Sequence, residues 1–307
     1  MPDMPSTPMD RQREVRVSRL HQGRRRSGIL FALPAMLLVL GIIGLPLAQA
    51  LWYSFTDWNG ATANWTGLRN YRNVFLDPEL SRALINTSLI MLSIPFGMFF
   101  SFIAAYLLSR VSVASALLRT VIFAPTALSW IVIGVVARHV FGNEGQLNAG
   151  LSAIGLDALA TNWLARPTSA MIALLLTFNA AVFGVNTIIF LTALSTIDRS
   201  TLEAARLDGA SEARILTAIV FPAVRRFVEF VFIVTMVASF TGIFGLIYVM
   251  TGGGPGSATM TLEFAVWRRA LSTGAFGPGA AIGISLMLMI LLVITAVRLL
   301  SRSGEKE

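Results

Sequence analysis

Two asparagines, Asn179 and Asn186, lie seven residues apart within an otherwise apolar stretch of the chain. A separation of seven residues places both side chains on the same face of an α-helix. An amide at membrane depth has two ordinary uses: it hydrogen-bonds a neighbouring helix, or it lines a polar path for a solute. The residue types fit both uses, so the pair is a candidate for helix–helix contacts and for solute contacts alike.

A second polar group interrupts another apolar stretch near its middle. It consists of Ser239, Phe240 and Thr241, followed by Gly242. Its hydroxyls can hydrogen-bond a solute, and its ring offers a flat apolar surface for stacking. Because neither polar group has a Trp or Tyr beside it, Phe240 is the main stacking candidate.

Residues for ATP hydrolysis and other common catalysis are missing from the sequence. A phosphate-binding P-loop needs a lysine directly after a glycine-rich turn, and Lys306 is the only lysine. The chain has no cysteine, and His21 and His139 are too far apart to form a metal motif. We therefore predict no enzymatic site, no metal site and no cofactor held by this chain.

The charged residues also argue against an ion-coupled carrier, which usually has an acidic side chain deep in the membrane. Glu229 lies only about one turn beyond Arg225 and Arg226, and the middles of the apolar stretches contain no acid. We interpret Glu229 as an ion-paired residue at the membrane interface. Active transport by this chain would then draw energy from a partner.

Residues 200–222 form a polar segment between two strongly apolar ones. Ser200 and Glu203 have the spacing of a capping box, which predicts that a helix begins here. Gly209 supplies the left-handed conformation that ends helices. Ser211 then favours the start of a second short helix over residues 212–220. After it, Pro222 is expected to stop that helix or redirect the chain.

This segment resembles the EAA loop of permeases from binding-protein-dependent ABC importers. The family usually has Leu-Pro where this chain has Phe221 and Pro222, and it often has a second proline near Arg225. The resemblance implies a cytoplasmic coupling helix-turn-helix that docks into the ATP-hydrolysing subunit. The residues expected to carry this coupling are Glu203, Ala204, Ala205, Asp208, Gly209, Ala210 and Pro222.

Residues 251–255, Thr-Gly-Gly-Gly-Pro, resemble the T-x-G-G-P signature of one of the two permeases in carbohydrate importers. A flexible hairpin between two spans would also explain the glycines and the proline. The resemblance implies that Gly253, Gly254 and Pro255 contact the external solute-binding protein. It also implies that Asn179, Asn186, Ser239, Phe240 and Thr241 line the substrate path. A sugar suits these residues, since amides and hydroxyls bond its hydroxyl groups.

The composition describes a membrane protein. The 307 residues are 55% hydrophobic and 13% charged, with a mean hydropathy of +0.71, whereas a soluble domain carries about 25% charged residues. We predict an all-α polytopic membrane protein with six transmembrane helices, the coupling segment lying between spans four and five. A kink is expected at Pro125. The predicted spans are residues 29–55, 84–108, 117–141, 169–194, 227–250 and 280–300.

The positive charges set the expected topology. Seven arginines lie in residues 1–27, and others flank the apolar runs, so the positive-inside rule puts both termini and the coupling segment in the cytoplasm. The same rule explains the net charge of +8 better than nucleic-acid binding does. The expected organisation is a cytoplasmic tail (1–27), a first helix with an external loop (28–83), a core transmembrane domain (84–302) and a short cytoplasmic tail (303–307).

Together these features predict the permease subunit of an ATP-driven importer that moves a sugar or oligosaccharide across the bacterial inner membrane. The resemblance implies several partners: a second permease, two ATP-binding subunits that bind ATP and Mg²⁺, an external binding protein and the lipid bilayer. Two alternatives stay open. One is an ABC permease for another solute, such as glycerol phosphate or a polyol, and the other is a secondary transporter that works alone.

Overall fold

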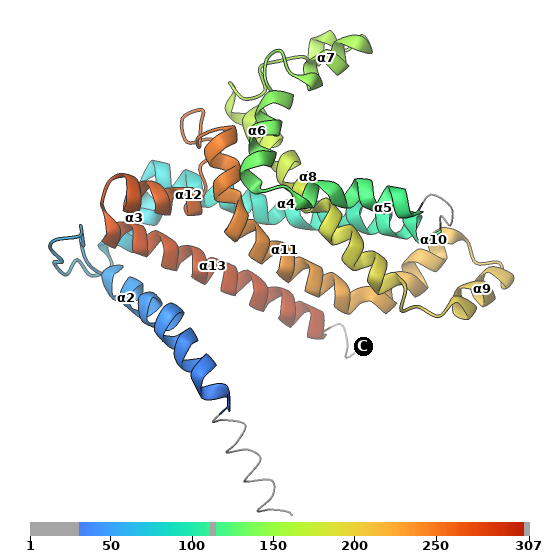
Figure 1. The fold of residues 1–307 in the computed structure, drawn as a ribbon, viewed down its shortest axis with the longest axis horizontal. Coiled ribbons are helices and arrows are strands. Elements are labelled where there is room, and N and C mark those ends of the chain that lie inside the picture. Colours follow the sequence, from blue (N-terminus) through green and yellow to red (C-terminus); the bar gives the residue numbers. More distant parts are fainter. Residues whose placement is uncertain (1–30, 111–114, 304–307) are drawn as a thin grey trace, which may run out of the picture. The chain divides into compact units, whose positions relative to one another are not determined.

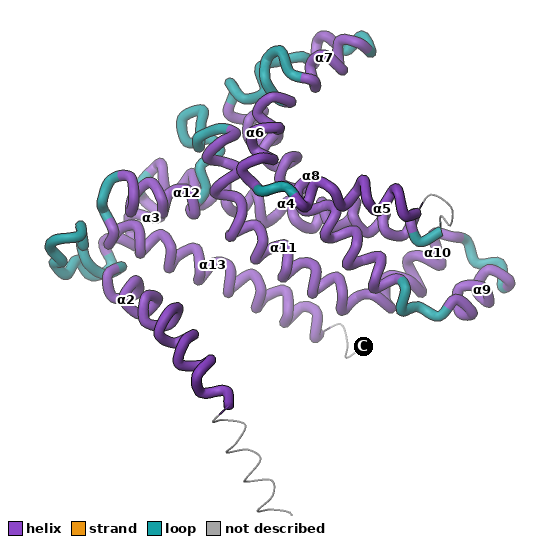
Figure 2. The backbone as a smooth tube through the Cα atoms, viewed as in Figure 1, coloured by secondary structure: helices purple, strands orange, loops and turns teal. Residues whose placement is uncertain are grey.

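In the computed structural model, residues 31–110 and 115–303 are described. They are almost entirely helical, and the only β pairing among them is an isolated bridge between Thr56 and Trp65 (Figure 2). The α-helices are α2 (Leu45–Tyr53), α3 (Arg69–Leu76), α4 (Pro78–Leu108), α5 (Ser115–Phe123), α6 (Trp130–Val140), α7 (Gln146–Ala153), α8 (Pro167–Leu194), α9 (Arg199–Leu207), α10 (Glu212–Ile215), α11 (Phe221–Met250), α12 (Leu262–Trp267) and α13 (Phe276–Ser303).

The chain divides into two compact units, and the first ends at Trp52. Its described part belongs to the apolar helix Phe31–Tyr53, which is long enough to cross a membrane. A π-helical turn, Leu40–Gly44, interrupts this helix just before α2. No residue in its most apolar window is buried inside the chain. The span predicted at residues 29–55 is confirmed over the described residues.

The second unit contains the longest helices, α4, α8, α11 and α13 (Figure 1). All four are long and apolar enough to span a membrane, as predicted. Span four matches its predicted range closely, because Pro167 begins α8 and Leu194 ends it. Span two begins earlier than predicted: Asp77 caps α4 by accepting from the amide of Glu79, and Pro78 occupies the first turn.

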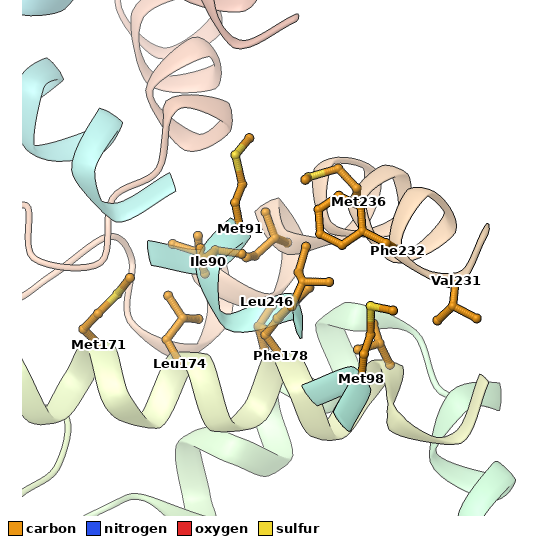
Figure 3. Close-up of a cluster of buried hydrophobic side chains, with 14 of the residues drawn as sticks. Ile90, Met91, Met98, Met171, Leu174, Phe178, Val231, Phe232, Met236 and Leu246 are labelled. Carbon is orange, nitrogen blue, oxygen red and sulfur yellow. The ribbon is translucent and has the colours of Figure 1, made fainter. Parts of the chain in front are cut away.

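The core of the second unit lies where α4, α8 and α11 pack together. Figure 3 shows aliphatic and sulfur-containing side chains from all three helices converging, with Phe178 among them fully buried. Three polar contacts add to this packing: Thr235 and Asn186 link α11 to α8, Asn179 and Ser93 link α8 to α4, and Glu229 pairs with Arg298 at 3.8 Å. The last pair agrees with the interfacial ion pair predicted for Glu229.

The third predicted span is broken. Two apolar helices, Leu117–Ala127 and Trp130–Val140, meet at an angle of 102°. Pro125 lies in a short 3₁₀ turn, Ala124–Ala127, and Ser129 caps α6 by accepting from the amide of Val132 at 3.3 Å. The kink expected at Pro125 therefore occurs, but it is much larger than a proline kink within one helix.

The expectation that Pro222 stops or redirects the second helix of the coupling segment is wrong. The helix runs on through a π-helical turn, Leu216–Val220, directly into α11. Pro222 sits in the first turn after that π-helical segment. A π-turn changes the local hydrogen-bond pattern, which lets the chain accommodate a residue with no amide hydrogen. The continuous helix Glu212–Met250 thus joins the coupling segment to span five.

We expect Gly184→Ala to destabilise the bundle, because α8 approaches α5 most closely at this glycine. An added Cβ would overlap the carbonyl oxygen of Ile122 and lie 2.8 Å from Thr126 Cγ2. Backbone atoms cannot move aside easily, so the cost should be about 1–3 kcal/mol. Thermal unfolding of the detergent-purified protein measures it. Gly150→Ala is the matched control, since nothing lies within 4 Å of its added Cβ; equal melting temperatures for both variants would contradict this packing.

Candidate functional site

The segment predicted to couple transport to ATP forms a helical hairpin, α9 followed by α10. Leu202 and Ala205 pack against the core cluster, while Glu203 and Ala204 are exposed. The predicted capping box is wrong in one respect: Asp198 caps α9 by accepting from the amide of Ser200 at 3.0 Å. Ser200 is therefore inside the first turn. Asp198 is itself a favourable N-cap residue, and it lies at the point where the chain leaves α8.

The turn between α9 and α10 has the geometry that the sequence predicts. Asp208 ends α9, and Gly209 follows with φ of +79°. The amide of Ala210 then donates to the carbonyl of Ala205 at 3.0 Å, a closure typical of a Schellman motif. Ser211 caps α10 by accepting from the amide of Arg214, as predicted.

This hairpin presents a small, mostly uncrowded surface to solvent. Asp208 and Gly209 are exposed, and the side chain of Leu207 is 88% exposed. A single exposed leucine is ordinary on a protein surface, so docking of a partner on this hairpin stays a prediction. Pro222 is exposed as well but lies beyond the hairpin, at the start of α11.

A second candidate site is a small cavity of about 170 Å³ inside the second unit, whose mostly apolar lining includes three polar side chains, Thr126, Asn186 and Thr235. It lies between the start of α6 and the middle parts of α8 and α11. The lining residues are Thr126, Leu128, Trp130, Ile133, Ala181, Val182, Val185, Asn186, Val234, Thr235 and Ala238. None of them is charged.

Asn186 is the most informative residue of this cavity. Its Oδ1 accepts from the hydroxyl of Thr235 at 2.9 Å, but its buried Nδ2 has no hydrogen-bond partner in the protein. Buried polar groups are nearly always satisfied, so a donor left over beside a cavity indicates a place for a polar ligand or water.

The other predicted path residues lie outside this cavity. Asn179 packs against Gly97 of α4 and donates to Ser93 Oγ at 3.1 Å and to the carbonyl of Leu175 at 2.8 Å. Ser239 is buried and donates within its own helix. Phe240 packs against the core cluster, and Thr241 is exposed. The structure thus brings Asn186 to the cavity and leaves the other four residues away from it.

Sequence reasoning missed Trp130 as a cavity residue. The ring is half-buried, stacks against Phe178 with centroids 6.0 Å apart, and lies against Gly242, where an added Cβ would overlap it. One signal was available: Trp usually lies at the membrane interface, and this one falls in the middle of the third predicted span. The bend between α5 and α6 brings it to the cavity.

A larger cavity of about 460 Å³ lies between α4, α8, α11 and α13. Phenylalanines and Met98 dominate its lining, and Arg225 and Glu229 are the charged residues in it. A polar solute needs several hydrogen-bond partners to replace its water, which this lining lacks. We therefore take the smaller cavity at Asn186 as the candidate solute site.

The glycine-rich segment predicted to contact a binding protein is held in place from within. Thr259 donates to the carbonyl of Gly254 at 2.8 Å, and the Asn86 amide of α4 donates to the carbonyls of Ser257 and Met260. Gly253 is buried, whereas Gly254 and Pro255 are half-buried. The segment is therefore an ordered feature attached to α4, and contact between these three residues and a partner stays a prediction.

Glu263 of α12 follows this segment, and it should make stability depend on pH. Burial raises the pKa of Glu263 to about 8. Between pH ~4.5 and ~8 the folded state therefore holds a proton that the unfolded chain releases, so stability falls as pH rises through this window. We expect Glu263→Gln, which stays neutral, to raise the melting temperature by a few degrees at pH 8 and by much less near pH 4.5.

The exposed Glu144 provides the control for this prediction, because Glu144→Gln removes a carboxylate that is already in water. Scanning fluorimetry of both variants at the two pH values separates burial from the general effect of losing a charge. A Glu263→Gln shift that is the same at both pH values would show that the carboxyl titrates normally.

The matching family model is the binding-protein-dependent transport system inner membrane component, over residues 93–305. The chain belongs to this family, and it is a multi-pass membrane protein. It is 28% identical to the multiple sugar-binding transport system permease protein MsmF of Streptococcus mutans, over 91% of this chain and 96% of that one. It is 30% identical to the sn-glycerol-3-phosphate transport system permease protein UgpA of Pectobacterium atrosepticum, over 85% and 89%.

The fold is also that of a solved importer. The structure of a bacterial ABC transporter involved in the import of the acidic polysaccharide alginate superposes with a TM-score of 0.78, covering 93% of this chain and 99% of that one at 20% identity. The predicted fold class, an all-α polytopic membrane protein, and the predicted family are confirmed. The described residues contain five candidate spans, and the predicted number of six is reached when the bent pair Leu117–Ala127 and Trp130–Val140 counts as one span.

Proposed function

We propose that this chain is the permease of an ATP-driven importer that carries a neutral sugar or oligosaccharide across the inner membrane. The cavity at Asn186 supports the choice of substrate. Its lining includes the amide of Asn186, which lies beside the hydroxyl of Thr235, and the ring of Trp130. Sugars are bound by this combination, with hydrogen bonds at the hydroxyl groups and an aromatic ring against the C–H face.

The uncharged lining of the cavity favours a sugar over glycerol phosphate. Glycerol phosphate is the main alternative, because the relative from Pectobacterium atrosepticum is a permease of an sn-glycerol-3-phosphate transport system. A phosphate group in a low-dielectric site needs cationic or multiple N–H donors. Of the two cavities compared above, the larger, apolar one has charged lining residues, Arg225 and Glu229, and the smaller one has none. A polyol would fit the same cavity less well, because it lacks the rigid ring face that stacks on Trp130.

The remaining parts of the proposal concern partners and orientation. A second permease completes the pathway, two ATP-binding subunits dock on the α9–α10 hairpin, and an external binding protein delivers the solute. The hairpin lies at the end of the second unit opposite α3 and α12 (Figure 1). If the hairpin is cytoplasmic, as the arginine distribution favours, the glycine-rich segment faces outward. ATP and Mg²⁺ are bound by the partners, and both termini are cytoplasmic.

In the proposed cycle, closure of the ATP-binding subunits moves the hairpin, and the continuous helix Glu212–Met250 transmits this movement to the cavity at Thr235. The solute enters from the outside while the cavity opens outward, and it leaves after ATP hydrolysis. The chain itself contributes binding and movement but no chemical step.

The experiment that tests this proposal is purification of the tagged chain from detergent-solubilised native membranes. We expect an ATP-binding subunit and a second permease to co-purify. ATP hydrolysis by the reconstituted complex should rise when the sugar-loaded binding protein is added, and labelled sugar should accumulate in the vesicles. A chain that purifies alone and transports without ATP would overturn the proposal in favour of a secondary transporter. Accumulation of glycerol phosphate in place of sugar would contradict the proposed substrate but not the proposed class of transporter.

A further inference from the structure

Three side chains meet at the carboxylate of Glu212, the first residue of α10. Its Oε2 accepts from Tyr106, near the end of α4, at 3.0 Å and pairs with Arg110, in the turn that follows α4. Its Oε1 accepts from Arg206 of α9 at 3.2 Å. One carboxylate therefore joins α4 to both helices of the hairpin.

The other members of this cluster also hold one another. The guanidinium of Arg110 lies over the ring of Tyr106, 4.4 Å from its centroid, and donates to the phenol oxygen. A cation above an aromatic face is attracted to it, and the same guanidinium nitrogen, Nη2, contacts both the phenol oxygen and the carboxylate. The contacts are therefore cooperative, and removing the carboxylate removes the common partner of all three.

The cluster contributes little to folding. The side chains of Arg110, Arg206 and Glu212 are 35%, 44% and 51% exposed. Ion pairs this accessible to water add little to stability, because solvent screens them and ordering the side chains costs entropy. The hairpin already has its own caps and its own apolar contacts through Leu202 and Ile215. An exposed network across three segments is better explained by a need to keep their relative geometry.

We propose that Glu212 is a positioning residue that makes the hairpin and the inner end of α4 move as one body. This proposal rests on the proposed function of the hairpin as the docking element. Without the carboxylate, a push on α9 would still reach α11 through the continuous helix, but α4 would not follow. Because α4 packs along α8, which carries Asn186, its movement changes the cavity as well. Glu212 thus determines how much transport each ATP yields.

The absence of cysteine from the sequence makes a direct test practical. The variant Arg110→Cys/Glu212→Cys removes the ion pair and allows a short bis-methanethiosulfonate reagent, which forms a reducible disulfide with each cysteine, to join the same two positions. In the reconstituted complex, we expect the unlinked variant to carry about tenfold less solute per ATP hydrolysed than the wild type. Cross-linking should restore the ratio to within about twofold, and reduction should lower it again.

Single variants and a control complete the design. Arg110→Gln and Glu212→Gln should each lower the solute carried per ATP, and the double variant should be no worse than Glu212→Gln alone, because the contact of Arg110 with the carboxylate is already lost in that variant. Arg82→Gln, an exposed arginine on α4 but outside both the cluster and the hairpin, should leave the ratio unchanged. Melting temperatures should stay close to wild type in all of them, which separates this effect from unfolding.

Two outcomes would overturn the proposal. One is a cross-linked pair that no longer transports, because the hairpin and α4 would then have to separate during the cycle. The other is wild-type coupling in both Gln variants. In either case a wild-type complex that still transports at the expense of ATP leaves the proposed function standing, whereas a wild-type chain without ATP-binding partners would contradict the proposed function itself.

Discussion

Gly209→Asp is expected to lower ATP-driven uptake by about a hundredfold or more while leaving the membrane spans folded. Gly209 is exposed at the tip of the α9–α10 hairpin, with φ of +79° and nothing within 4 Å of an added Cβ. An aspartate there costs the fold only about 1–2 kcal/mol, since Asp tolerates the left-handed region better than most residues. At a docked interface the same side chain adds bulk and a buried, uncompensated charge, which costs several kcal/mol. Uptake of labelled solute and co-purification of the ATP-binding subunit measure the two effects.

Gly209→Asn is the matched control, because asparagine has nearly the same shape and the same tolerance of positive φ but no charge. It should keep much more uptake than the aspartate variant. If both variants fail equally, added bulk or the backbone of the turn is responsible and charge is not. Normal uptake by Gly209→Asp would contradict the assignment of this hairpin as the docking element.

The parts of this hairpin that could be predicted from sequence are those determined by neighbouring residues. The end of α9 at Gly209 and the cap at Ser211 depend on backbone conformations that a few residues decide. The start of α9 was predicted wrongly, because Asp198 and Ser200 are both good caps two residues apart. Which of the two residues caps α9 depends on where α8 ends and on how Leu202 packs against the core.

Features that depend on distant residues could not be predicted. The order in the segment after Gly253 comes from Asn86, which is more than 170 residues away, and from ion pairs of Arg269 with Asp77 and of Arg268 with Glu79. The 102° bend between α5 and α6 also depends on distant residues. Pro125 predicts a kink, but the angle of the kink depends on the helices packed around it. Trp130 was missed for the same reason, because only that bend brings its ring to the cavity.

The two asparagines show how far helix periodicity can go. Their spacing predicts one common face of α8, but that face meets two different neighbours along its length. Asn179 contacts Ser93 and Gly97 of α4, whereas Asn186 contacts Thr235 of α11 and the cavity. The sequence left open whether these residues make helix contacts or solute contacts. In the structure Asn179 makes a helix contact and Asn186 lines the cavity, so the two uses can be tested separately.

Asn186→Leu is expected to lower sugar uptake about fivefold or more without lowering the melting temperature. Leucine has a similar volume but no donor, so the solute loses a hydrogen bond inside a cavity that excludes water, and one such bond to an uncharged group contributes about 1 kcal/mol or more. The fold loses little, because the buried Nδ2 has no partner to lose and Thr235 can donate within its own helix instead. Uptake and stimulated ATP hydrolysis are measured together, since a cavity residue should affect the first much more than the second.

Asn179→Leu, seven residues earlier on the same helix, is the matched control. It removes two hydrogen bonds, to Ser93 and to the carbonyl of Leu175, beside the close approach of Gly97. We expect its melting temperature to fall, by an amount that corresponds to about 1–2 kcal/mol, while uptake per folded molecule stays near wild type. Asn186→Leu should thus lower transport but not stability, whereas Asn179→Leu should lower stability but not transport. If Asn179→Leu stops transport and Asn186→Leu does not, the solute path lies along α4 and the cavity beside Trp130 is not part of it.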